Sequence, residues 1–224
     1  MVMRVTDAER ARIAAAIVEA EQQTDGEIVV ILAEQSDAYH DVALHWALLA
    51  AFLALAVIAA WPSFFAGWLD RLAGWGQSPD ARTMLTALLA IVAAKFLVAR
   101  LLLAWRPLRM ALTPAATKAR RVRRRAVLLF KAGTERRTAT RTGALLYLSL
   151  AEHRAEIVVD DTIHAKVPPE AWGAAMAALI DAVRDGRTGE GMANAIGMIG
   201  AILADALPFT GTDPNELPDR LIEL

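Results

Sequence analysis

Two long apolar runs dominate the pattern of hydrophobic and polar positions along the chain. The first covers 42–69 and contains no acidic or basic side chain, and the second covers 83–105. A helix needs about 20 apolar residues to cross the hydrocarbon core of a bilayer. Each run is therefore long enough to span a membrane. The pair predicts a two-helix transmembrane hairpin, with spans over about 42–62 and 83–105.

The second run is the weaker of the two because it contains Lys95 and Arg100. A central lysine costs about 2.5–3.5 kcal/mol on insertion scales, and each Leu, Ile, Val or Phe offsets roughly 0.3–0.6 kcal/mol of it. We therefore expect insertion to depend on pairing with the first run, and an in-plane or re-entrant second segment is the alternative. Lys95 is either a functional residue or one that snorkels or faces a lipid phosphate. The first run offers no acidic partner, which favours the second interpretation.

The sequence on both sides of the hairpin predicts short helices and strands. Before it, residues 6–9 (T-D-A-E) form a capping box ahead of an amphipathic helix, and 27–32 is a β-branched run typical of a strand covered on both faces. Beyond it, a basic helix that ends at Gly133 precedes two apolar runs, 144–150 and 156–159, which predict a strand hairpin. Two more amphipathic helices follow, with apolar positions at Trp172, Ala175, Met176, Leu179, Ile180 and Val183, and then at Met192, Ile196, Ile199 and Leu203.

These elements predict an α/β fold, a small α/β/α sandwich in which four helices flank the strands. The first helix and strand are too short to build a core alone, so they need the sequence beyond the hairpin. The hairpin is therefore predicted to interrupt a single domain, whose two parts share one side of the membrane. Gly197 and Gly200 are expected to allow close helix packing. The predicted boundaries are 1–38 and 110–210 for the two parts of the domain, 39–109 for the transmembrane hairpin and 211–224 for a C-terminal tail.

Charge places both ends of the chain in the cytoplasm. The net charge is −1, but 106–131 holds nine lysines or arginines and no acid, and such residues near span ends favour the cytoplasmic face. Charged residues interrupt 1–20, which is therefore no signal peptide. Cysteine is absent, which excludes disulfides and thiolate chemistry. We predict a multi-pass protein of the cytoplasmic (inner) membrane, with the basic block on anionic lipid and no nucleic acid as a partner.

The candidate chemistry is an acidic site after the third predicted strand. Asp160 and Asp161 end that strand, His164 follows, and Ser36 and Asp37 come just after the first strand. Ligands of open α/β sheets gather beyond the carboxyl ends of strands, and carboxylate oxygens suit Ca²⁺ or Mg²⁺. We therefore expect Asp160, Asp161 and Asp37 to converge on a divalent cation. The alternative is that the paired aspartates make a solvated turn.

The remaining motifs are less specific. Residues 141–143 (R-T-G) either bind an anion or simply lead into a strand, and Glu152 and His153 are expected in an exposed hairpin loop. The segment 188–191 (T-G-E-G) is too short and misplaced for a nucleotide-binding fingerprint. The chain has no Walker loop, metalloprotease helix motif or nucleophile elbow.

Two parts of the chain resemble the TPM domain family, the thylakoid acid-phosphatase-like domain. One is 6–32, with its T-D-G-E-I-V-V-I, and the other is 141–172, with its R-T-G-A-L-L-Y-L, continuing into the helix around 192–202. The resemblance is to a bacterial membrane subgroup with spans inside the domain. It implies an α/β/α sandwich, and activities such as acid phosphatase, calcium binding, or accessory roles in assembling or repairing membrane complexes. Many members carry a glycine-rich turn where this chain has 160–163 (D-D-T-I).

The sequence thus favours a membrane-anchored TPM-like domain that acts as an accessory or interaction module at the bacterial cytoplasmic membrane. Its expected partners are the lipid bilayer and another membrane protein or complex. The alternative is a divalent-metal-assisted phosphatase with its acidic site at Asp160 and Asp161, for which Ca²⁺ or Mg²⁺ would be the cofactor.

Overall fold

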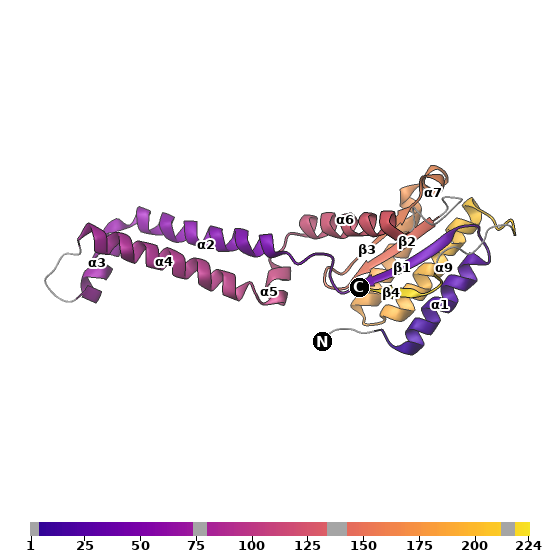
Figure 1. Cartoon of the computed structure of the whole chain (residues 1–224), viewed down its shortest axis with the longest axis horizontal. Helices are drawn as coiled ribbons and strands as arrows, with labels where there is room; N and C mark the ends of the chain where they lie inside the picture. The colour runs from indigo at the N-terminus through magenta and orange to yellow at the C-terminus, as the bar shows by residue number, and fades with distance from the viewer. Residues whose placement is uncertain (1–4, 74–79, 134–142, 212–217) are drawn as a thin grey trace. The chain divides into compact units, whose positions relative to one another are not determined.

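The computed structural model describes residues 5–73, 80–133, 143–211 and 218–224, which form two compact units (Figure 1). The α/β unit comprises Met1–Asp37 together with Ala115–Leu224, and the helical unit comprises Ala38–Pro114. The α/β unit is therefore discontinuous in sequence. The predicted mixed α/β class is confirmed.

A four-stranded sheet in the order β3-β2-β1-β4 forms the centre of the α/β unit. β1 pairs in parallel with β2 and with β4, whereas β3 pairs antiparallel with β2. Both parallel pairs join β1, which precedes the helical unit in the sequence, to a strand that follows that unit. The strands are β1 (Glu27–Ala33), β2 (Gly143–Ser149), β3 (Arg154–Val159) and β4 (Leu221–Glu223).

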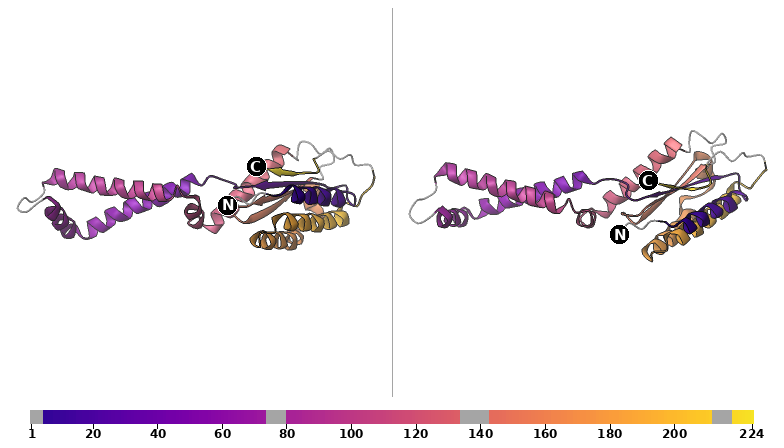
Figure 2. Two further views of the ribbon diagram at one scale, coloured as in Figure 1. Left: turned by 90° about the horizontal axis from the view of Figure 1, so that it is seen from below. Right: turned by 60° about the horizontal axis from the view of Figure 1, so that its bottom comes forward.

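Helices cover both faces of this sheet. β1 and β2 are buried at every position, and successive side chains of a strand point to opposite faces. Val30 and Leu146 face a core shared with α1 (Asp7–Glu21), α8 (Gly173–Arg184) and α9 (Thr188–Ala206). On the other face, α6 contributes Val122, Ala126 and Phe130 to a second core with Ile31 and Tyr147. Figure 2 shows α6 (Ala115–Gly133) and the other three helices on opposite sides of the sheet.

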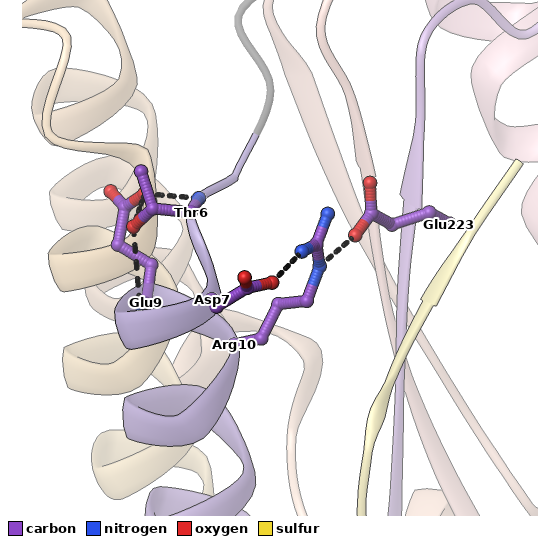
Figure 3. Close-up of polar contacts among 5 residues, drawn as sticks. All are labelled: Thr6, Asp7, Glu9, Arg10 and Glu223. Atoms are coloured by element: carbon purple, nitrogen blue, oxygen red, sulfur yellow. Dashed lines mark hydrogen bonds and ion pairs between the residues drawn. The ribbon is translucent and has the colours of Figure 1, made fainter.

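The first helix begins at the predicted capping box, which is confirmed. The Oε2 atom of Glu9 accepts hydrogen bonds of 2.8 Å from both the backbone N–H and the hydroxyl of Thr6, and Thr6 Oγ1 accepts one from Glu9 N–H. These bonds, with the backbone N–H of Thr6 the largest cause, lower the pKa of Glu9. One turn on, Arg10 pairs with Asp7 and, at 2.6 Å, with Glu223 of β4 (Figure 3). The start of α1 is thus tied to the edge strand.

Two elements differ from the sequence prediction. β4 lies in the predicted tail, where its three residues pair with β1 and cover an edge that would otherwise expose unpaired backbone groups. Three residues are too few to show strand alternation in the sequence. At Asp160 and Asp161, where a solvated turn was the alternative to a metal site, the chain opens a short helix, α7 (Asp161–Lys166). The 3₁₀ turn η1 (Pro169–Trp172) follows it.

The helical unit contains α2, α3, α4 and α5, with α2 and α4 packed against each other. By length and composition, α2 and α4 are both able to cross a membrane. Each begins two residues before the predicted span, and α2 ends at Ala60, just before Pro62 opens α3. The helices are α2 (His40–Ala60), α3 (Pro62–Ala73), α4 (Ala81–Leu102) and α5 (Arg106–Ala111).

Candidate functional site

Asp160, the centre of the predicted acidic site, is held in the framework of the sheet. Its side chain is buried, and Oδ2 accepts a 2.9 Å hydrogen bond from the backbone N–H of Gly143, while its own N–H donates to the Gly143 carbonyl at 3.0 Å. It also occupies the N-cap position of α7. Asp161 and His164 lie on α7 with exposed side chains. These contacts make Asp160 a residue that joins β3 to the start of β2.

The structure does not bring Asp37 together with Asp160 and Asp161, the three residues of the predicted metal site. β3 runs antiparallel to β2, which places Asp160 at the start of β2, whereas Asp37 follows the carboxyl end of β1. Seven-residue strands rise about 3.3 Å per residue, so the two ends are roughly 20 Å apart. Asp37 instead pairs with Arg121 of α6, with 3.0 Å between Oδ2 and Nη1.

Within the described ranges, no group of three or more His, Asp or Glu side chains is arranged to hold a metal ion. Residues 141 and 142 of the predicted R-T-G motif lie outside those ranges, and Gly143 opens β2. The segment 188–191 opens α9 and is mostly buried. The prediction that Glu152 is exposed is also wrong, since its residue surface is only 5% accessible.

Glu152 is the acceptor of a polar cluster at the carboxyl ends of β1 and β2. Its Oε1 accepts a 3.0 Å hydrogen bond from the backbone N–H of Ser36, and its Oε2 accepts one from the hydroxyl of Ser149. Ser36 Oγ donates to Ser149 Oγ at 2.9 Å and lies 2.9 Å from the Tyr147 hydroxyl. We call Ser36, Tyr147, Ser149 and Glu152 the Glu152 cluster.

The Glu152 cluster is a single chain of donors that ends on a carboxylate. Because Ser36 uses its one proton toward Ser149, the Tyr147 hydroxyl is the donor to Ser36. Burial raises the pKa of Tyr147, and the charge of Glu152 adds to that effect, so this phenol keeps its proton at neutral pH. Hydroxyls linked to a carboxylate are the geometry of an activated nucleophile. Here, however, Tyr147, Ser149 and Glu152 are all buried. The hydrogen bonds of the Glu152 cluster hold Ser36 in place at the end of the first segment of the α/β unit.

Part of this cluster was visible in the sequence. Tyr147 and Ser149 are two apart on a strand and so share a face, and both lie on the buried strand that the sequence predicts. The burial of Glu152 could not be predicted from the sequence, because a charged residue in a predicted hairpin loop is ordinarily exposed.

Most of the exposed large apolar side chains of the described structure lie in the helical unit. In the most apolar stretch of α2, 22% of the residues are buried. In the most apolar stretch of α4, none is buried. Monomeric soluble proteins rarely expose contiguous apolar patches larger than a few hundred Å². The exposed large side chains include Leu48, Leu49, Phe52 and Leu53 on α2, and Leu85, Leu89, Leu97 and Leu101 on α4.

Comparisons with known proteins found a family similarity in one part of the chain. Residues 109–202 match the family described as TPM domain. Among solved structures, the chain is similar to the NMR structure of the BA42 protein from the psychrophilic bacterium Bizionia argentinensis, with a TM-score of 0.55 and 18% identity over 98% of this chain and 95% of that chain. At this identity the likeness concerns the fold alone. No significant sequence match was found among curated proteins.

The matched region begins in α5 and extends into α9, so it includes β2 and β3. The match thus covers less than half of the chain. α1 and β1 precede the matched region, although β1 is the parallel neighbour of β2 in the sheet.

Proposed function

We propose that the chain is an integral membrane protein in which α2 and α4 form a transmembrane hairpin inserted into a TPM-like α/β/α domain. The domain serves as an accessory or interaction module at the cytoplasmic face of the bacterial inner membrane. The observation that carries this proposal is the apolar surface of α2 and α4, which the described structure leaves uncovered.

The two ordinary explanations for a long apolar helix fit this surface poorly. A core helix of a soluble protein is buried by its neighbours, whereas α4 has no buried residue. A signal sequence stands at the start of a chain, whereas α2 follows a folded helix and strand of the α/β unit. A hydrocarbon environment covers both helices, whose backbone groups are already satisfied by hydrogen bonds within each helix.

Pairing of strands across the hairpin supports the two-crossing topology. β1 precedes α2 and β2 follows α4, yet the two strands share a sheet and a core. Both must therefore lie on the same side of the membrane, which requires an even number of crossings. The basic block then indicates the cytoplasmic side. Its members are Arg106, Arg109, Lys118, Arg120, Arg121, Arg123, Arg124, Arg125 and Lys131.

The contacts around Asp160 favour a module over a phosphatase. Asp160 uses a carboxylate oxygen to hold the start of β2, and Asp37 lies beyond the far end of the sheet. The alternative is tested by assaying the detergent-purified protein on p-nitrophenyl phosphate with Ca²⁺ and with Mg²⁺. Hydrolysis that disappears in Asp161→Asn, while the melting temperature is unchanged, would establish the phosphatase in place of the module.

Membrane insertion itself is tested by alkaline carbonate extraction of membranes that contain the full chain. We expect the protein to stay in the pellet and to require detergent for release. Recovery in the carbonate supernatant would contradict the proposal, since peripheral proteins are released under these conditions and inserted helices are not.

A further inference from the structure

We propose that the helical unit holds a binding site for an anionic phospholipid, with an acyl chain in a cavity between α2, α3 and α4 and the phosphate at Lys95. This inference rests on the proposed membrane insertion and extends it to a specific lipid class. The site lies within one unit of the structure.

The cavity has a volume of about 720 Å³, within the range of 300–1,000 Å³ that is usual for small-molecule sites. Its walls come from the end of α2, from α3 and from the middle of α4. They are apolar apart from a single cation. The lining includes Val57, Trp61, Phe64, Phe65, Trp68 and Lys95.

Lys95 gives this cavity its chemical preference. Within the described ranges its ammonium makes no hydrogen bond or ion pair, and the acidic residues of the helical unit (Asp41, Asp70 and Asp80) do not line the cavity. An ammonium inside a span is costly unless it pairs with an anion. An anionic group delivered by the ligand meets that requirement, because no side chain of the cavity does.

The open apolar walls identify the ligand as a lipid. Trp61 and Phe64 are 63% and 74% exposed, so the cavity opens toward the region that hydrocarbon would fill. Aromatic and aliphatic walls accept an acyl chain through burial of apolar surface. A net-negative headgroup presents its phosphate without the competing cation of choline. The site therefore prefers phosphatidylglycerol to phosphatidylcholine.

Native mass spectrometry of the full chain in detergent tests this preference. The protein is equilibrated with equal amounts of phosphatidylglycerol and phosphatidylcholine that carry identical acyl chains. We expect at least tenfold more retained phosphatidylglycerol, since charge-assisted hydrogen bonds are the strong ones. Lys95→Met should abolish the preference, and Lys95→Arg should keep it. Ile91→Trp keeps the charge but fills the cavity, and it should reduce retention of both lipids.

Two control variants separate this site from other basic residues. Arg100→Gln removes a charge from the same helix without altering the cavity lining, and Arg124→Gln removes one from α6. Both should keep the preference. Equal retention of the two lipids by the native protein, or a preference lost in Arg124→Gln and kept in Lys95→Met, would overturn the inference. A protein that needs detergent but shows no preference disproves only the lipid site, whereas one that is soluble without detergent disproves membrane insertion as well.

Discussion

At the scale of single residues, the surroundings of Glu21 in the folded protein strongly raise the pKa of its carboxyl group. Burial raises its pKa to about 8, and the charges of Glu27 and Asp219 add to that effect, although a 2.8 Å hydrogen bond from the Ile28 N–H opposes it. Glu21 also ends α1, where the helix dipole disfavours an anion. At neutral pH this carboxyl is therefore protonated in the folded protein.

This pKa predicts how stability depends on pH. An unfolded glutamate loses its proton near pH 4.5 and the folded one near pH 8, so the folded state holds an extra proton between these values. Stability contributed by Glu21 is present below pH 4.5, falls as pH rises to 8 and is then constant. Glutamine resembles the protonated form of glutamate. We therefore expect the melting temperature of Glu21→Gln to depend less on pH between pH 5 and 8 than that of the native protein. Glu19→Gln, on the exposed face of the same helix, should leave the profile as it is.

The Glu152 cluster gives a second prediction at this scale. Glu152→Ala leaves the Ser36 N–H and the Ser149 hydroxyl without their acceptor, and each buried unpaired group costs about 1–3 kcal/mol. We expect a loss of about 2–5 kcal/mol in the free energy of unfolding, measured by denaturant titration in detergent. The exposed Glu170 provides the control, since Glu170→Ala should change it by less than about 0.5 kcal/mol. Equal effects of the two substitutions would show that the Glu152 cluster contributes nothing.

At the scale of elements, α1 and α9 pack closely enough to distinguish two glycines that look alike in the sequence. A Cβ atom on Gly200 would lie 2.5 Å from the Ala20 Cβ and 3.1 Å from its Cα, whereas a Cβ on Gly197 would meet nothing within 4 Å. The expectation of close packing is therefore confirmed at Gly200 and wrong at Gly197. Helical periodicity shows which residues share a face but not how near the neighbouring backbone comes.

These two positions predict opposite effects of one substitution. Gly200→Ala should destabilise the protein by about 1–3 kcal/mol through overpacking, partly offset by its gain in helix propensity. Gly197→Ala should stabilise it by up to about 1 kcal/mol, because alanine is the better helix former and has room. Melting temperatures measured side by side in one detergent check both signs. A stabilising Gly200→Ala would mean that α1 and α9 are farther apart than described.

The helices and strands could be predicted from the sequence better than the candidate site could. The long helices and the three longer strands follow from periodicity, and the Thr6 capping box follows from a local hydrogen-bond pattern. Asp37 does not lie beside Asp160 and Asp161, for a topological reason that the sequence prediction already contained. A hairpin between β2 and β3 reverses the third strand, so its carboxyl end lies beside the start of β2 rather than beside Asp37. Convergence at carboxyl ends holds only for parallel neighbours.

At the scale of the whole molecule, the α/β unit is complete only when segments from both sides of the helical unit combine. β1 supplies a strand with two parallel neighbours, and α1 supplies part of the larger core. Composition predicted that the apolar helices could span a membrane, but only the strand pairing shows that their flanks belong to one sheet. The central claim is therefore that residues before and after the hairpin share one side of the membrane.

Single-cysteine labelling in intact cells tests that claim most directly, because the chain has no cysteine of its own. Exposed positions are available in α1 (Arg12), in α3 (Arg71) and in the α/β unit after the hairpin (Glu170). With a membrane-impermeant maleimide, Arg71→Cys should be labelled in intact cells, while Arg12→Cys and Glu170→Cys should be labelled only after lysis. Labelling of Arg12→Cys and Glu170→Cys from opposite sides of the membrane would contradict the account.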